Sequence, residues 1–422
     1  MSDKKVKFLV RGGIIALATT SILLIGLHTL ASIAALDWNS WAFFDWLVNY
    51  KAGFVRRGLV GALIHRYGYG HEVVWVNCLV FVLGASIVAL LATLALRISN
   101  FHPKAALLYT ISPAGFFWMA LSNQYYYRKE MLFYLSLLTI AHLYLYWKQT
   151  ENRKIAGMVL ALIAISFLIL PLVHEAFLFF CLLYFYLITA SIVGFYAPGK
   201  TTRSILRLLV IANLVIFAML SWFKGNAEQS SIIWASLSSS AQAVADRDGI
   251  SGGISAIGWS IFKGFSLSVR AILSGMGTYY LFALAVIYLV VGYIFSALSG
   301  LALVQAYRNQ RLNITFAAVC LSFLPLFALG WDWGRWIVGI YIVSSTMVIS
   351  GVFVEVDSYI AIVDRIVSER VLTIFFFLML FAICLLTKIP ECCIDGPGDS
   401  FYKNRFVSSI VHNLKDASKQ SQ

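Results

Sequence analysis

The chain has 422 residues, of which 60% are hydrophobic and only 12% are charged, and its mean hydropathy is +0.83. Soluble domains carry about 25% charged residues, so the composition excludes a soluble globular protein and predicts an integral membrane protein. The net charge of +13 is not gathered in a Lys/Arg-rich block, which excludes the usual pattern of nucleic-acid binding.

Apolar runs long enough to cross a bilayer, about 20 residues each, recur along the chain. They predict an all-α, polytopic membrane helical bundle of about 11 transmembrane helices, with interfacial helices in the outer loops. Residues 1–390 form this single bundle in the prediction, and residues 391–422 form a polar C-terminal tail. The runs lie near 12–36, 74–96, 104–121, 131–147, 155–173, 175–196, 207–223, 277–303, 312–330, 336–355 and 371–387.

The distribution of Lys and Arg among the short connectors predicts the orientation. The N-terminus and the connectors near 148–154, 200–207 and 308–311 are basic, and with eleven spans they fall on one side. We therefore expect a bacterial inner-membrane protein with a cytoplasmic N-terminus, and the first run reads as a retained signal anchor. The opposite face receives the charges of the outer loops near 37–73 and 224–276 and those at 128–130, 174–175 and 332–335, so an active centre is expected to open outward.

The first outer loop carries most of the candidate residues. Asp37 and Asp45 follow the first apolar run, and Arg56 and Arg57 lie in its FVRR segment. A carboxylate beside the membrane can act as a general base toward a sugar hydroxyl, and arginines bind phosphate through two parallel hydrogen bonds. The alternative is an amphipathic interfacial helix that an aspartate caps and whose arginines contact lipid headgroups.

Two further polar segments open or close apolar runs. In QYYYRKEMLF, Arg128 is predicted to bind phosphate, and Tyr126 and Glu130 to contact carbohydrate; the alternative is a charged helix start with tyrosine anchors. His174 and Glu175 end the fifth run after Pro171, which favours a kinked or broken helix. The pair is interpreted either as a base with its partner or as a satisfied polar pair between helices.

The last outer segments add one compact motif and one long loop. In WDWGRW, Arg335 is predicted to hold a phosphate while Trp331, Asp332 and Trp333 contact sugar, the alternative being an aromatic belt with a local Asp–Arg pair. The loop 224–276 contains an amphipathic stretch that includes Arg270 and predicts a surface helix, which could serve as a lid.

No metal site is predicted. The six cysteines lack metal-ligand spacing and no HExxH pattern occurs. The DRDG segment at Asp246 to Gly249 resembles a metal-binding sequence only superficially, and a turn is the favoured interpretation. We therefore expect no cofactor, and a divalent cation is not indicated.

These features resemble the GT-C type of membrane glycosyltransferase, which uses polyprenyl-phosphate-linked sugar donors. The resemblance rests on the acidic residue after the first span (Asp37 or Asp45), the first outer loop and the RKEMLFYLSLL start of the fourth span. Within that class the single multi-span body and long outer loop look like the O-antigen and capsular polysaccharide polymerases. The chain departs from the class in having no clear DxD in the first loop and no large soluble C-terminal domain.

The resemblance implies a reaction that joins oligosaccharide repeat units carried on undecaprenyl pyrophosphate at the periplasmic face. The implied partners are that lipid-linked oligosaccharide, membrane lipid and a chain-length regulator protein, with no nucleic acid. In this scheme the leaving pyrophosphate is stabilised by arginines, and the candidates are Arg56, Arg57, Arg128, Arg270 and Arg335. The candidates for the catalytic base are Asp37, Asp45, His174 and Glu175.

Three other classes of function remain open at this stage. A transporter or flippase of a lipid-linked or anionic solute predicts internal repeats with matched broken segments, and no convincing repeat is found. The other two are a different membrane transferase and a scaffold without chemistry. A single outward-opening pocket that gathers the five arginines is the arrangement that favours the polymerase.

Overall fold

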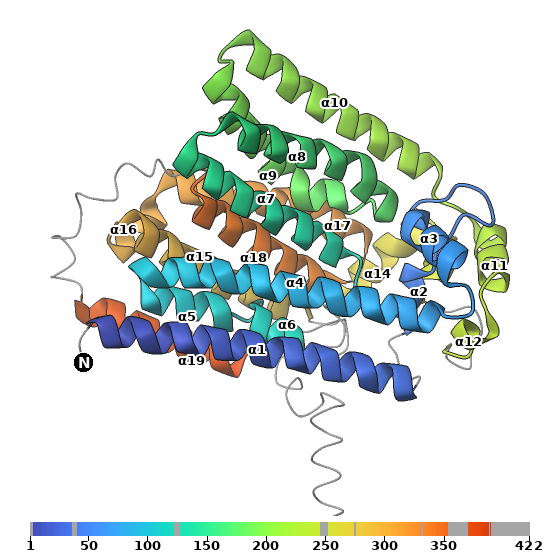
Figure 1. Ribbon diagram of the computed structural model, residues 1–422, viewed down its shortest axis with the longest axis horizontal. Helices are drawn as coiled ribbons and strands as arrows, with labels where there is room; N and C mark the ends of the chain where they lie inside the picture. The colour runs from blue at the N-terminus through green and yellow to red at the C-terminus, as the bar shows by residue number, and fades with distance from the viewer. Residues whose placement is uncertain are drawn as a thin grey trace, which may run out of the picture.

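The computed structural model describes residues 3–35, 40–121, 127–244, 252–273, 276–330, 332–352, 370–387 and 389. These residues form nineteen α-helices and no strand (Figure 1). The predicted all-α class is therefore confirmed for the described part of the chain.

Seven of the described helices are long and apolar enough to cross a membrane, which is the pattern of a multi-pass membrane protein. Two further apolar helices, α18 (Trp333–Ser350) and α19 (Arg370–Leu386), are shorter. The predicted count of eleven spans is not confirmed. The seven are α1 (Asp3–Ala35), α4 (Glu72–Phe101), α8 (Arg153–Val173), α9 (Phe177–Tyr196), α10 (Lys200–Trp222), α15 (Met276–Ser299) and α17 (Gln310–Leu329).

The predicted third span is two short helices, α5 (Pro103–Ile111) and α6 (Phe116–Leu121). The break falls at Ser112-Pro113, because the residue before a proline is driven out of the helical region. Helix α7 (Glu130–Thr150) forms as predicted and has a spanning length, but its tyrosines and its histidine make it less apolar than the seven.

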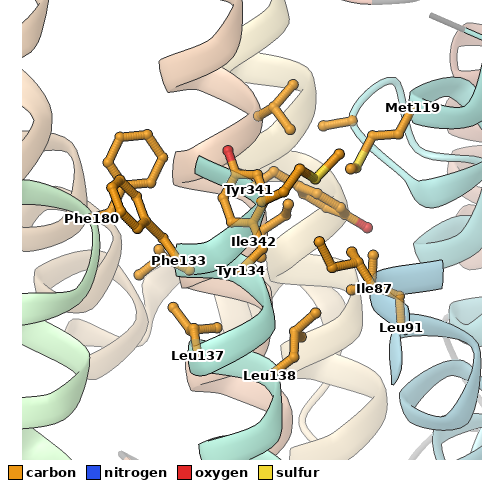
Figure 2. Packing of buried hydrophobic residues seen from close by; sticks show 14 of the residues in the cluster. Ile87, Leu91, Met119, Phe133, Tyr134, Leu137, Leu138, Phe180, Tyr341 and Ile342 are labelled. Carbon is orange, nitrogen blue, oxygen red and sulfur yellow. The ribbon is translucent and has the colours of Figure 1, made fainter. Parts of the chain in front are cut away.

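Helices α7, α9 and α18 pack against one another at the centre of the bundle. Nearly all of α18 is buried, and the ring of Phe133 contacts those of Phe177 and Phe180. Figure 2 shows this core, with Phe133 and Tyr134 of α7 beside Phe180 and Tyr341. Helices α4 and α5 extend the core, and α1, α10 and α19 lie at its periphery (Figure 1).

Several short helices gather at the end of the bundle opposite the N-terminus (Figure 1). The connection from α15 to α17, which contains α16 (Leu303–Arg308), lies at the other end. The gathered helices are α2 (Ser40–Trp46), α3 (Gly58–Gly68), α11 (Ala227–Ala235), α12 (Ser239–Gln242), α13 (Gly252–Ala256) and α14 (Ile261–Leu273).

Helix α2 is not the membrane-surface helix that the sequence suggested. Phe43, Phe44 and Trp46 are fully buried, and α13 packs directly on α2. These three aromatic side chains of α2 are packed inside the protein, and α13 of the second long loop covers the helix. Helix α14, by contrast, does expose Phe262 and Phe265, as an interfacial helix would.

Hydrogen bonds fix the second long loop onto the first. The carboxylate of Glu72, at the start of α4, is fully buried and accepts hydrogen bonds from the backbone N–H and the hydroxyl of Ser238. The side-chain amide of Asn49 donates to Ser236 Oγ, and that of Gln229 donates to the carbonyl of Ala52. The part of the second long loop that contains α11 and α12 is therefore docked on the first loop.

Candidate functional site

A cluster of ionisable side chains lies where α2 and four connectors meet. The connectors precede α3, α7, α9 and α18, so residues from Arg56 to Arg335 meet although they lie far apart in the chain. The ionisable cluster, as we call it below, comprises Asp45, Arg56, Arg57, Arg128, Lys129, Glu130, His174, Glu175, Asp332 and Arg335.

Glu175 is the centre of one half of the cluster. It accepts a hydrogen bond of 3.0 Å from Nη1 of Arg56, and Nε of Arg57 donates to both of its oxygens at 2.9 and 3.2 Å. Arg57 Nη1 also lies 3.8 Å from Asp45 Oδ1. Two arginines on one carboxylate make this a strong, geometrically defined ion pair.

Arg335 is the centre of the other half. It donates to Glu130 Oε1 at 2.7 Å and to the carboxylate of Asp332, three residues earlier on α18. The local Asp–Arg pair of WDWGRW therefore forms, and it extends to the start of α7. Asp332 feels the charge of Arg57 as well as that of Arg335, which joins the two halves electrostatically.

Lys129 connects the cluster to the backbone of the first loop. It is fully buried, and its Nζ donates a hydrogen bond of 2.7 Å to the carbonyl oxygen of Arg57. Arg57 has a left-handed backbone with φ of 67°, which costs a non-glycine residue about 1–2 kcal/mol. The contacts of Arg57 with Lys129 and Glu175 hold this strained conformation, as at other functional sites.

Burial and charge set the protonation states of the acidic groups. Burial alone would raise the pKa of Asp45, but Lys129 and Arg57 bring it below its usual value. Burial likewise opposes the ionisation of Glu175, and Arg57 and Arg56 nevertheless hold its pKa well below the usual range. Both carboxylates are therefore ionised at neutral pH.

The basic groups are shifted by the same environment. Burial lowers the pKa of Lys129 to about 8, even though Asp45 opposes the shift. Burial, with Arg57 next, lowers the pKa of His174 to about 4, so its imidazole is neutral at pH 7. His174 Nδ1 accepts a hydrogen bond from the N–H of Ala176 at 3.1 Å, which assigns the ring proton to Nε2.

Asp45, on α2, directs its Oδ1 toward Arg57. Packing around α2 holds this side chain in place. Trp46 Nε1 donates to the carbonyl of Tyr127 at 2.7 Å, which joins α2 to the connector before α7. Gly253 of α13 lies against the backbone of Asp45, where a Cβ atom would come within 2.6 Å of Asp45 Cα. Among the described residues, Asp45 Oδ1 has no hydrogen-bond partner.

The structure brings together most of the site residues that the sequence predicted. Arg270 is separate, since it is exposed on α14 and takes part in none of the ion pairs described for the cluster. Trp333 lies beside the cluster with its indole N–H donated to the carbonyls of Phe327 and Gly330. Three predicted residues lie outside the described residues: Asp37, Tyr126 and Trp331.

Sequence reasoning missed Lys129 as a member of the site. The sequence pattern predicts site roles for its neighbours Arg128 and Glu130 but gives none to Lys129. The signal that could have found it is its position at the mouth of an apolar run, where an unpaired lysine is costly to bury.

Within the described part of the chain, no group of three or more His, Cys, Asp or Glu residues could hold a metal ion. The acidic residues of the ionisable cluster instead lie within ion-pair distance of arginines. No protein-family model, curated protein or solved structure matches the chain. The function is therefore inferred from the site alone.

Proposed function

We propose that the protein is a membrane glycosyltransferase that joins oligosaccharide units carried on a polyprenyl pyrophosphate, of the O-antigen or capsular polysaccharide polymerase type. The observation that carries the proposal is the ionisable cluster itself. Buried ionisable groups at the end of a membrane bundle are costly and are usually functional. The cluster combines a cationic surplus, suited to a pyrophosphate, with a buried carboxylate oxygen, Asp45 Oδ1, that has no hydrogen-bond partner among the described residues.

In the proposed reaction the bond between the anomeric carbon and the pyrophosphate oxygen breaks, and an acceptor hydroxyl forms the new glycosidic bond. The proton of that hydroxyl passes to a base, and the lipid pyrophosphate leaves with one additional negative charge. Cationic groups lower the barrier because they are already oriented toward the charge that develops. In this scheme the reaction occurs at the periplasmic face of the inner membrane.

Among the described residues, Asp45 is the carboxylate best placed to act as the base. Glu175 already accepts hydrogen bonds from Arg56 and Arg57, and Glu130 accepts one from Arg335, so arginines already occupy these two carboxylates. Asp45 has only a distant contact with Arg57, at 3.8 Å. It lies beneath α13, so a sugar reaches it only when α13 moves.

The test uses purified protein reconstituted with a polyprenyl-pyrophosphate-linked oligosaccharide. Wild-type protein should form joined chains and release the lipid pyrophosphate. The Asp45→Asn variant should form no product, while the control Glu228→Gln, on the exposed side of α11, should retain activity. Joined chains from Asp45→Asn at the wild-type rate would exclude Asp45 as the base. Movement of the lipid-linked sugar across the bilayer without joining would favour a flippase.

A further inference from the structure

The cations of the ionisable cluster are not equivalent. Arg56, Arg57 and Arg335 each make an ion pair with a carboxylate. Lys129 makes a hydrogen bond to a backbone carbonyl. Among the described residues, that leaves Arg128 as the cluster cation with neither kind of contact from its side chain.

Arg128 is also buried at an unfavourable position. Its exposed fraction is 7%, and within the described residues its Nε has no hydrogen-bond partner. Burial and the nearby positive charge of Arg335 both lower its pKa. A buried charge without a partner is strongly destabilising, so the folded protein tolerates Arg128 rather than gaining stability from it.

The backbone on both sides of Arg128 is nevertheless held firmly. The preceding carbonyl, that of Tyr127, accepts the hydrogen bond from Trp46. The following side chain, that of Lys129, is hydrogen-bonded to Arg57. Two residues after Arg128 the 21-residue helix α7 begins, and its N-terminal end adds partial positive charge. The guanidinium is therefore held in advance in an electropositive setting.

We propose that Arg128 is the residue that receives the phosphate of the ligand, while Arg56, Arg57 and Arg335 orient the carboxylates. This assignment rests on the proposed function for the source of the phosphate. Of the five arginines that the sequence predicted to bind pyrophosphate, it makes Arg128 the primary phosphate contact. A phosphate oxygen pair matches the planar fork of a guanidinium. It would also give Arg128 the anionic partner at ion-pair distance that it lacks among the described residues of the cluster, where the ion pairs are made by Arg56, Arg57 and Arg335.

The test measures equilibrium binding to purified protein in lipid nanodiscs, with two probes: inorganic pyrophosphate and a polyprenyl pyrophosphate without sugar. Arg128→Gln is compared with Arg56→Gln, a matched substitution of an arginine that has a carboxylate partner. We expect Arg128→Gln to weaken binding by about 10- to 100-fold, the usual effect of a lost charge-assisted contact. Arg56→Gln should change it much less.

Thermal unfolding of the same variants separates this role from a structural one. Removing Arg128 removes a repulsion, so Arg128→Gln should unfold at the wild-type temperature or above it, whereas a structural arginine would lower that temperature. Arg128→Lys keeps the charge without the fork and should bind with intermediate affinity. Equal affinity for Arg128→Gln and wild type, or loss of binding only in Arg56→Gln, would overturn the assignment.

The two probes distinguish the source of the phosphate. Binding of both probes through Arg128 identifies a general phosphate site, and binding of the lipid probe alone shows that the polyprenyl chain is required. No binding of either probe by wild type rejects the site. Because no sugar transfer is measured, a result that supports Arg128 stands even if the joining reaction fails to occur.

Discussion

Replacing Glu175 with Gln tests whether this carboxylate holds the first outer loop in place. Glu175 lies between α8 and α9 and is 118 residues from Arg57, yet it accepts from Arg56 at 3.0 Å and from Arg57 Nε at 2.9 Å. The Gln side chain has nearly the same shape and keeps one oxygen acceptor. The substitution therefore removes the charge and leaves the packing.

The magnitude follows from burial. Removing one partner of a buried ion pair costs about 3–5 kcal/mol, because the other charge remains buried. The side chains of Arg56 and Arg57 are 23% and 20% exposed, and that of Glu175 is 14% exposed. Partial hydration and the remaining oxygen of Gln reduce the cost, so we expect a loss of about 2–3 kcal/mol.

The assay is thermal unfolding of purified protein in detergent, compared with the control Glu151→Gln. Glu151 is an exposed acidic residue between α7 and α8. A loss of 1 kcal/mol lowers the midpoint by about 2–4 °C in chains of 150–250 residues and by less in a longer chain, so Glu175→Gln should unfold several degrees below the control. Equal midpoints for the two variants would show that the pair does not stabilise the loop.

Three further predictions concern pH, packing and orientation. The pKa of His174 is about 4 in the folded protein and about 6.5 in the unfolded chain, so the free energy of unfolding should fall by up to about 3 kcal/mol as the pH drops through this window. His174→Gln should make the free energy of unfolding less dependent on pH between pH 7 and pH 4, whereas the control His71→Gln should not. Gly253→Ala should displace Asp45 and reduce the rate at which oligosaccharides are joined. The control Gly157→Ala, whose Cβ would meet open space, should leave that rate unchanged and be neutral or slightly stabilising for the fold. Equal activity of the two variants would contradict the close contact of α13 with Asp45. A reporter fused after Lys154 should score cytoplasmic, and a periplasmic score would reverse the proposed orientation.

The meeting of distant loops was predictable because of where their charges lie. Arg128, Glu175 and Arg335 each lie beside an apolar run, and Arg56 lies in the connector between the first two runs. Runs that alternate in direction bring every second connector to the same end. The break at Pro113 was also predictable from backbone sterics. These inferences need only hydropathy and chain direction.

The partners within the cluster were not predictable in the same way. Nothing in the local sequence pairs Glu175 with Arg57 rather than with the adjacent His174, since the choice depends on how α3 meets the end of α8. The burial of α2 depends likewise on α13, which lies about 200 residues later in the chain and packs Gly253 against Asp45. Long-range packing decided both. The predicted third span is two short helices, α5 and α6, so the count of eleven spans is not confirmed.

The most direct test of the account is an experimental structure of the protein in a lipid nanodisc with a polyprenyl-pyrophosphate-linked oligosaccharide bound. The account predicts that the pyrophosphate contacts Arg128 beside the start of α7, with the sugar directed toward Asp45 and α13 displaced. A pyrophosphate bound at exposed Arg270, or at the end of the bundle that carries α16, with the ionisable cluster unchanged, would contradict it.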